Sequence, residues 1–313
     1  MNVIVTGTLS FDYIMDFSGR FADRIMPEKI HNVSLSFLVD TLHKQFGGTA
    51  GNIAYTLRLL GLDPQIISPG GSDFAPYTKH LKKHRVSTKY ISIQKNALTS
   101  LYFVLTDTED NQIGSFFLGA TKYAKNLTLK KAVQGETFAV LSANEPVAMK
   151  RYVKECKILH IPYMYDPSFQ IANFSPEELR DGIVGAKIVI GNDYEIALME
   201  RKLEISHEEL VTLAPIVITT LGRRGSIIET RRDAIHIKPA KPKSEIDPTG
   251  AGDAYRAGLV AGYLRGYDLA ICGQMGSTAA VYTVELYGTQ THEFSKKEFI
   301  ARYKQNFGKT IDL

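Results

Sequence analysis

Short runs of apolar, β-branched residues alternate along the chain with longer segments in which apolar residues recur every three or four positions. The first run, at residues 3–6, is followed by Gly7 and is typical of a buried strand that ends in a turn. Residues 51–61 have helical spacing, with Gly61 as a plausible stop. Further strands are expected at 65–68, 138–143, 161–167, 187–191 and 216–220, and further helices at 146–160 and after the capping sequences at 175–178, 206–209 and 295–298. Strands that alternate with helices indicate a mostly parallel sheet covered on both faces.

Two regions break this alternation. Residues 30–39, and the pair 100–106 and 112–118 joined by the turn-like sequence DTEDN, alternate or run apolar with no helix between them. They are expected to form antiparallel strands of a small sheet apart from the main one. A lid over a cleft and a dimer surface are both uses of such a sheet, and the pattern does not separate them.

Composition adds limits on the class of protein. With 313 residues, 44% of them hydrophobic, the chain can bury a large core as one domain or one domain with a small appendage. The net charge of +4 is small and the Lys and Arg residues are scattered, which gives no support to nucleic-acid binding. Cys156 and Cys272 form no CxxC pair, no apolar stretch nears the roughly eighteen residues that cross a bilayer, and no secretion signal is recognisable. A cytoplasmic protein without membrane contact is expected.

The sequence IDPTGAGDAYRAG, at residues 246–258, carries the strongest chemical signal. Gly250 and Gly252 lack side chains, so backbone N–H groups and the positive end of a helix that starts near Gly252 can converge on an anion. A carboxylate at Asp253 would repel that anion unless it takes part in chemistry. It is well placed to accept a proton from a hydroxyl that attacks a bound phosphate, which makes Asp253 a candidate general base.

Other interpretations of this motif are open. Asp253 can serve simply as a carboxylate at a helix N-terminus, where the helix dipole favours it. A dinucleotide-binding fingerprint needs a glycine where Tyr255 stands, and a phosphate-binding Walker A loop needs a following Gly-Lys-Ser/Thr, so both fit poorly. Arg256, one turn into the helix, could touch phosphate, although a cation there would lower the pKa of the base.

The motif occurs with five others in a fixed order along the chain. They are GTLSFDYIMDF at 7–17, FGGTAGNIA at 46–54, YDP at 165–167, GNDYE at 191–195, TTLGRRGS at 219–226 and DPTGAGDAYRAGL at 247–259. With this set the sequence resembles the ribokinase-like, or PfkB, family of sugar and nucleoside kinases over nearly its whole length. Within that family it looks most like the archaeal and bacterial nucleoside kinases of the adenosine type.

The resemblance implies a fold and its division. It implies a ribokinase-like three-layer α/β/α sandwich with a mostly parallel central sheet and a small β-sheet lid. Residues 1–14, 47–97 and 121–313 would form the large nucleotide- and substrate-binding unit. Residues 15–46 and 98–120 would form the lid.

The resemblance also implies a substrate site. Asp12 would hydrogen-bond ribose hydroxyls, and Gly47, Gly48 and Asn52 would close on the sugar. A helix-entry loop with Asn52 facing solvent is the alternative. Asp166 and Gln112 complete the expected substrate set, although Asp166 could be structural and Gln112 could belong to a turn. Four aromatic residues on the predicted lid strands offer either a stacking surface for a base or ordinary packing, namely Tyr102, Phe103, Phe116 and Phe117.

The nucleotide and metal sites follow from the same resemblance. Gly250, Ala251 and Gly252 would steady the transferred phosphoryl group, and Asn192 and Glu195 would order Mg²⁺ and its waters. The remaining residues expected along ATP are Thr220, Gly222, Gly225, Thr249 and Gly288. Each group has a plain structural alternative, namely a helix N-terminus for the Asn-x-x-Glu pair, a strand hairpin for TTLGRRGS and a helix C-cap for Gly288. A requirement for K⁺ near Asp247 and Thr249 stays open.

Together these observations predict an Mg²⁺- and ATP-dependent kinase that phosphorylates the 5′-hydroxyl of a ribonucleoside, with Asp253 as base. A ribokinase- or fructokinase-like sugar kinase is the first alternative. A catalytically silent nucleoside-binding regulator on the same fold is the second, and a NAD-dependent dehydrogenase fits less well than either. A homodimer formed through the lid is a further open expectation.

Overall fold

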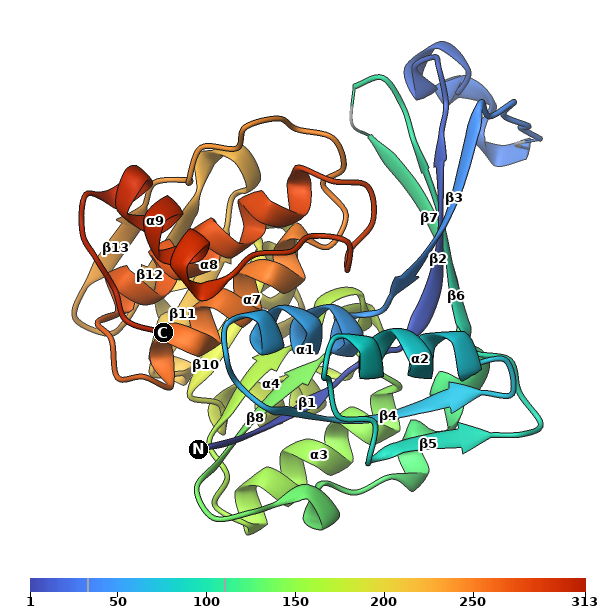
Figure 1. Cartoon of the computed structure of the whole chain (residues 1–313). Helices are drawn as coiled ribbons and strands as arrows, with labels where there is room; N and C mark the ends of the chain where they lie inside the picture. The colour runs from blue at the N-terminus through green and yellow to red at the C-terminus, as the bar shows by residue number, and fades with distance from the viewer. Residues whose placement is uncertain (33, 110) are drawn as a thin grey trace.

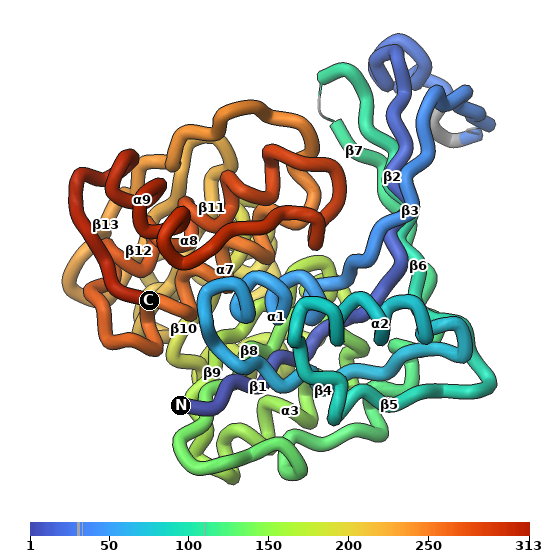
Figure 2. Tube along the Cα trace, in the orientation of Figure 1, coloured from blue at the N-terminus to red at the C-terminus, as the bar shows by residue number. Residues whose placement is uncertain are grey.

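The computed structural model describes residues 1–32, 34–109 and 111–313, and the described residues build two sheets (Figures 1 and 2). The central sheet of this part of the chain has nine strands in the order β13-β12-β11-β10-β9-β8-β1-β4-β5. Its strands are β1 (Asn2–Thr6), β4 (Pro64–Gly71), β5 (Ile91–Gln94), β8 (Thr137–Ser142), β9 (Tyr163–Asp166), β10 (Ile188–Asn192), β11 (Ile216–Thr220), β12 (Ser226–Glu229) and β13 (Ala234–Ile237). All neighbours from β5 to β11 are parallel, whereas β12 and β13 join antiparallel at the edge. The predicted mostly parallel sheet is therefore confirmed.

Helices cover both faces of this sheet. They are α1 (Thr49–Leu59), α2 (Ala75–Lys83), α3 (Pro146–Ile158), α4 (Pro176–Val184), α5 (Asp193–Leu203), α6 (His207–Leu213), α7 (Ala251–Tyr263), α8 (Leu269–Val284) and α9 (Lys296–Phe307). Successive side chains of β1 point to opposite faces, so Val3 and Val5 pack with α1, α7, α8 and α9, while Ile4 packs with α3 to α6. The two hydrophobic clusters on either side of one sheet make the three-layer sandwich.

The capping sequences begin helices as predicted. Ser175, Ser206 and Ser295 each accept a hydrogen bond from the backbone of the glutamate three residues on, and that glutamate accepts one from the serine backbone. These reciprocal bonds satisfy donors that a helix N-terminus otherwise leaves unpaired. None of the helices in the described residues is long and apolar enough to cross a membrane.

The second sheet stands apart from the body (Figure 1). Its order is β3-β2-β6-β7, with β2 (Ser10–Asp16), β3 (Thr41–Gly47), β6 (Ser100–Thr106) and β7 (Gln112–Phe117). The strands at 100–106 and 112–118 pair antiparallel as predicted, but β2 and β6 are parallel, so the sheet is mixed. We refer to this sheet and its connecting loops as the lid.

The prediction of a strand at 30–39 is wrong. A 3-10 helix covers Pro27–Asn32, residues 34–39 lie outside any strand, and β3 begins only at Thr41. The apolar side chain of Phe37 instead packs edge-on against Phe17 and Phe21 in a small cluster of its own. Residue 33, and residue 110 in the DTEDN turn, lie outside the described residues. The expected boundaries between lid and body stay a prediction, and β2 already begins at Ser10.

Candidate active site

The glycine-rich motif bends into the start of α7. Gly250 is the N-cap with φ +80°, and a Cβ atom there would come within 2.8 Å of Thr289 Cβ, so only glycine fits without strain. The N–H of Ala251 donates to Pro248 O at 3.2 Å. In the part of the chain that the structure describes, the N–H groups of Gly252 and Asp253 have no hydrogen-bond partner. Two free donors at the positive end of a helix can bind an anion.

Asp253 lies in the first turn of α7 and is half-buried. Asn52 Nδ2, from α1, donates to Asp253 Oδ2 at 2.8 Å. Burial raises the pKa of Asp253 to about 6, while the Arg256 charge and the Asn52 hydrogen bond hold it lower than burial alone would. The carboxylate is therefore largely ionised at pH 7 but close to the range in which a base gains and loses protons.

Asn52 is buried and does not face solvent. Its Oδ1 lies 2.6 Å from Thr289 Oγ1 and 2.9 Å from Gln290 Nε2, both from the loop after α8. The structural alternative of a solvent-facing Asn52 is therefore wrong. The sequence analysis did not anticipate these two partners, although the polar sequence GTQT after a helix of small residues was the available signal.

Asp12 is buried on β2 of the lid. Ser10 Oγ donates to Asp12 Oδ1 at 2.6 Å, and Gly47 lies so close that a Cβ atom there would fall 1.8 Å from Asp12 Oδ2. Burial raises the pKa of Asp12 to about 7, and the negative charges of Asp253 and Asp247 add to this rise. Gly48 begins α1 at φ +87° against the Thr8 carbonyl. The structure thus brings Asp12, Gly47, Asn52 and Asp253 to one place.

Asp166, which was expected in the substrate set, is paired with Arg256. At the end of β9, its two carboxylate oxygens accept hydrogen bonds from Arg256 Nε and NH2, each at 2.6 Å, and Ser142 Oγ donates to Oδ2. Arg256 also donates from NH1 to the Gly252 carbonyl at 3.0 Å. Both side chains are buried, so the arginine is engaged with Asp166 and supports the first turn of α7.

Asn192 and Glu195 form a capping box at the start of α5. Asn192 Oδ1 accepts from the Glu195 backbone N–H, and Glu195 Oε2 accepts from the Asn192 backbone N–H, both at 2.8 Å. Glu195 Oε1 accepts from Ser168 Oγ at 2.7 Å. The described residues hold no group of three or more His, Cys, Asp or Glu side chains that could by themselves bind a metal ion. One carboxylate and one amide fit only a hydrated Mg²⁺ that takes its other ligands from phosphates.

The TTLGRRGS sequence forms a hairpin. β11 and β12 pair antiparallel, with Thr220 opposite Ser226, and a 3-10 turn at Gly222–Arg224 joins them. Gly225 has φ +90° and a Cβ atom would fall 2.0 Å from Ile237 O, whereas Gly222 at φ +57° has open space around it. The strand hairpin that the sequence analysis left open is thus present. It does not exclude a role along the nucleotide, which stays a prediction.

Asp247 organises the loop before α7. Its Oδ1 accepts from the Thr249 N–H at 2.9 Å and its Oδ2 accepts from the Gly288 N–H at 3.0 Å. Gly288 has φ +89° and lies against Gln45 of the lid, where a Cβ atom would fall 2.7 Å from Gln45 Cδ. Thr249 Oγ1 is buried and has no hydrogen-bond partner among the described residues. This hydroxyl is free to contact a bound group.

Gln112 is not brought to the other predicted residues. It is exposed, pairs with Thr106, and its Nε2 donates to Thr106 Oγ1 at 3.3 Å. Asp12 is instead in register with Tyr102, which pairs with Phe116. Since the strand rises about 3.3 Å per residue, Gln112 lies about 13 Å along the sheet from Phe116.

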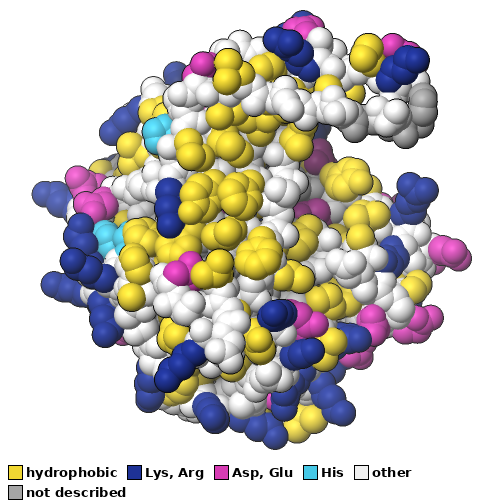
Figure 3. All heavy atoms as spheres, turned by 90° about the vertical axis from the view of Figure 1, so that its right-hand side faces the viewer, with side chains coloured by type: hydrophobic (Ala, Val, Ile, Leu, Met, Phe, Trp, Pro, Cys, Tyr) yellow, Lys and Arg dark blue, Asp and Glu magenta, His cyan; other side chains and the backbone are white. Residues whose placement is uncertain are grey.

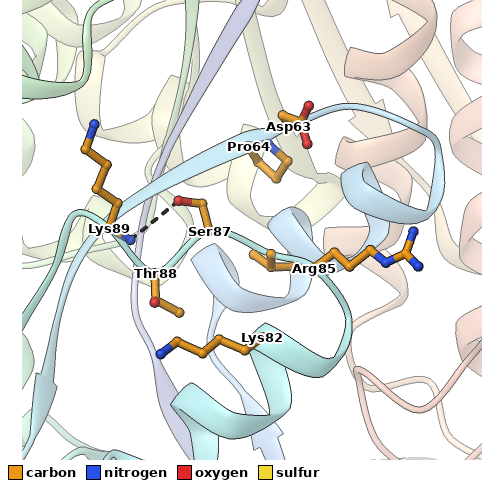
Figure 4. A pocket seen from close by; sticks show the side chains of 8 residues that line it. Asp63, Pro64, Lys82, Arg85, Ser87, Thr88 and Lys89 are labelled. Carbon is orange, nitrogen blue, oxygen red and sulfur yellow. Dashed lines mark hydrogen bonds between the residues drawn. The ribbon is translucent and has the colours of Figure 1, made fainter.

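The described part of the chain has a pocket beside the lid and another beside α2. One, of about 300 Å³, lies between the lid and the loop before α7 and is lined by Ile14, Asp16, Asp247 and Tyr287 among others. Because side chains alternate along a strand, Asp12 lies on the same face of β2 as Ile14 and Asp16, which line this pocket. The other, of about 460 Å³, is lined by Lys82, Arg85 and Lys89 beside α2 and contains none of the site residues (Figure 4).

Lid strands expose apolar side chains on their outer surface. Leu42, Ile113 and Phe117 are 60%, 44% and 49% exposed. Figure 3 shows one face of the molecule, on which hydrophobic side chains gather. The expected homodimer through the lid stays a prediction.

The family model of pfkB family carbohydrate kinases matches residues 9–296. The chain belongs to this family. The pfkB kinases are phosphotransferases with an alcohol group as acceptor, so the predicted family, fold and enzyme class are confirmed.

Several nucleoside kinases resemble this pfkB-family kinase along its whole length. The nucleoside kinase of Methanothermobacter thermautotrophicus is 30% identical over 98% of this chain and 97% of its own. The nucleoside kinase of Burkholderia thailandensis, 31% identical, superposes in its complex with inosine with a TM-score of 0.93 over 98% of this chain and 99% of that one. Its complex with ADP and inosine gives 0.92, and its ligand-free form gives 0.82 over 96% of this chain. As a whole, the structure of this chain is thus more similar to the two ligand-bound forms than to the ligand-free form.

Proposed function

We propose that this pfkB-family kinase transfers the γ-phosphate of ATP to the primary 5′-hydroxyl of a ribonucleoside, with Asp253 as general base. The observation that carries the proposal is the place of Asp253 itself. Its carboxylate, whose pKa burial raises to about 6, stands beside the free N–H groups of Gly252 and Asp253 at the positive end of α7. A proton acceptor next to an anion site is what attack by a hydroxyl on a phosphate requires.

Each part of the site then has a task. Asp253 accepts the proton as the hydroxyl oxygen forms its bond to phosphorus, and the free N–H groups stabilise the charge on the transferred group. Asp12, held by Ser10 and pressed against Gly47, accepts hydrogen bonds from the sugar hydroxyls. Arg256, held by its ion pair with Asp166, donates a hydrogen bond to the Gly252 carbonyl and so stabilises the first turn of α7.

The proposed reaction also requires a metal ion. Asn192 and Glu195 would hold a hydrated Mg²⁺ next to the phosphates, and the bound ion supplies neutralisation of charge on the β- and γ-phosphates. The buried, unpartnered hydroxyl of Thr249 is available to the nucleotide or to a K⁺ ion beside Asp247. Assays in matched K⁺ and Na⁺ buffers, and with chelated Mg²⁺, test both cations.

A nucleoside is favoured over a free sugar because the site continues beyond Asp12. The pocket of about 300 Å³ between the lid and the loop before α7 offers room for a base. Tyr102, in register with Asp12, and Phe116, whose ring centroid lies 6.4 Å from that of Tyr102, offer an aromatic surface on the same sheet. The Burkholderia relative, which binds inosine and ADP, supports a nucleoside acceptor and an adenine nucleotide donor.

The experiment is a coupled assay of ADP release across adenosine, inosine, guanosine, cytidine, ribose and fructose, with the monophosphate identified by mass. Turnover of one or more nucleosides well above ribose and fructose is expected. Higher kcat/KM for ribose or fructose would replace the proposal by a sugar kinase. Nucleoside binding with no monophosphate formed would favour a silent regulator.

A further inference from the structure

A chain of buried hydrogen bonds extends behind Asn52, on the side away from Asp253. Gln290 Nε2 lies 2.9 Å from Asn52 Oδ1 and 2.5 Å from Tyr77 OH, and Gln290 Oε1 lies 3.1 Å from His80 Nε2. Tyr77, Gln290 and Asn52 are 0%, 3% and 4% exposed. Polar groups with this little access to water depend on one another for hydrogen bonds.

This series of hydrogen bonds determines the orientation of the Asn52 amide. Asn52 Oδ1 accepts from the Gln290 amide at 2.9 Å and lies 2.6 Å from the Thr289 hydroxyl, whose single proton also faces the Phe46 carbonyl at 2.9 Å. An amide carbonyl so placed leaves only the NH₂ group for Asp253, to which Nδ2 donates at 2.8 Å. A flipped Asn52 would set its carbonyl oxygen against the Asp253 carboxylate and its NH₂ against the NH₂ of Gln290, whereas the Thr289 hydroxyl can act as donor or acceptor. The Gln290 amide is therefore the group that fixes the orientation on this side.

Gln290 is oriented in its turn by Tyr77 and His80. The Tyr77 hydroxyl donates to the Gly47 carbonyl at 2.7 Å, so its oxygen accepts from Gln290 Nε2. Burial and the neighbouring His84 lower the pKa of His80 to about 4, so its ring is neutral at pH 7 and carries one proton. With that proton on Nε2, His80 donates to Gln290 Oε1 and turns the Gln290 NH₂ toward Asn52.

We infer that Gln290 is a positioning residue for phosphoryl transfer: held by Tyr77 and His80, it fixes the Asn52 amide so that Nδ2 donates to the ionised Asp253. The inference rests on the proposed function of Asp253 as base. The same series of hydrogen bonds ends at the carbonyl of Gly47, the residue that lies against Asp12 and ends β3. Gln290 and Tyr77 therefore join the position of the lid strand to the orientation of the base.

The first test is Gln290→Leu, read as a pH profile of kcat/KM for the best nucleoside. Without Gln290, Asn52 loses the donor that orients its amide, and its hydrogen bond to Asp253 weakens. A hydrogen bond to the charged form of a carboxylate lowers its pKa, so weakening this bond should raise the pKa of Asp253. The acidic limb of the kcat/KM profile should therefore move up by about 0.5 to 1 pH unit. kcat should fall by about tenfold, the change expected from one hydrogen bond of about 1.4 kcal/mol, while KM for ATP changes little.

The second test uses a matched pair of tyrosines, which separates positioning from a loss of packing. Tyr77→Phe removes the hydroxyl that joins Gln290 to Gly47. Tyr303→Phe removes another hydroxyl from a fully buried tyrosine on a helix, one that donates to Gln274 at 2.5 Å and contacts no site residue. Similar losses of Tm are expected in both, and a shifted acidic limb only in Tyr77→Phe.

A double-mutant cycle completes the test. If Gln290 acts through Asn52, then adding Gln290→Leu to Asn52→Leu should leave the acidic limb and kcat of the single Asn52 variant unchanged. An additive effect, or an unshifted limb in Gln290→Leu with wild-type kcat, overturns the inference. Asp253→Asn is assayed alongside: if it loses turnover while Gln290→Leu does not, only the positioning role fails, and if it retains turnover, the proposed base itself fails.

Discussion

Arg256, which lies one helical turn after Asp253 on α7, donates two hydrogen bonds of 2.6 Å to the two carboxylate oxygens of Asp166. The two residues come from α7 and from the end of β9, and both are buried. A bidentate pair of this kind fixes the guanidinium in one plane, so its third nitrogen can hold the Gly252 carbonyl. The start of α7, which carries the proposed base, is thus joined to the central sheet.

Breaking this pair on one side should be costly. Arg256→Met leaves the Asp166 carboxylate buried without a counter-ion, and the expected loss in the free energy of unfolding is about 3–5 kcal/mol. Arg256→Met with Asp166→Leu should regain much of it, because neither charge remains. Urea denaturation of the three proteins measures both values. Equal unfolding midpoints for wild type and the single variant would contradict the structure of the pair.

The proposed base gives the clearest kinetic prediction. Asp253→Asn should lower kcat by about 10²–10⁴-fold, the usual contribution of general base catalysis, because an amide cannot take the proton. Nucleoside binding, measured by calorimetry, should remain. For the wild type, kcat/KM should fall tenfold per pH unit below about pH 6, where Asp253 becomes protonated. A flat profile down to pH 5 would argue against Asp253 as the group that titrates.

Asp12 should make the protein less stable at higher pH. Its pKa is about 7 in the folded protein and ordinarily 3.8, so the folded state binds more protons between these values. The stability from this group is complete below about pH 4 and is lost as the pH rises through 7. Asp12→Asn, which never ionises, should therefore raise Tm by a few degrees, roughly 2–4 °C, at pH 8. The gain should shrink at pH 5, as differential scanning fluorimetry can show, and nucleoside KM should rise.

The capping boxes of α5 and α6 offer a matched test of the metal site. Glu195→Gln and Glu209→Gln each replace the glutamate of a capping box by a residue that can still accept from the backbone. Both should change Tm little. Only Glu195→Gln should raise the Mg²⁺ concentration needed for half-maximal activity, by about three- to tenfold, because it removes a charge next to the phosphates. The same shift in Glu209→Gln would point to a general effect on the fold.

Local sequence was sufficient for much of the fold. The strands at 3–6 and 216–220 and the helices after Ser175, Ser206 and Ser295 follow from side-chain spacing and capping bonds within four residues. It failed at 30–39, where an apolar run packs against aromatic residues of the lid instead of pairing as a strand. Apolarity indicates burial, but it does not say which surface buries the residue.

The site was predictable in part for the same reason. Gly250 and Asp253 could be identified because the turn that needs positive φ and the helix end that attracts anions are both features of adjacent residues. The partner of Asp166 could not be derived, since a carboxylate and an arginine 90 residues apart carry no mark of their pairing.

The amino-acid pattern alone was thus enough to define the family, the layered α/β architecture and the motif that holds the proposed base. Folding was needed to show that Asn52 reaches Asp253 across 201 residues and that Gln290 reaches Asn52 across 238. The reason is physical: backbone conformation and capping depend on neighbours in sequence, whereas burial, amide orientation and the raised pKa of a carboxylate depend on whatever the fold packs around them.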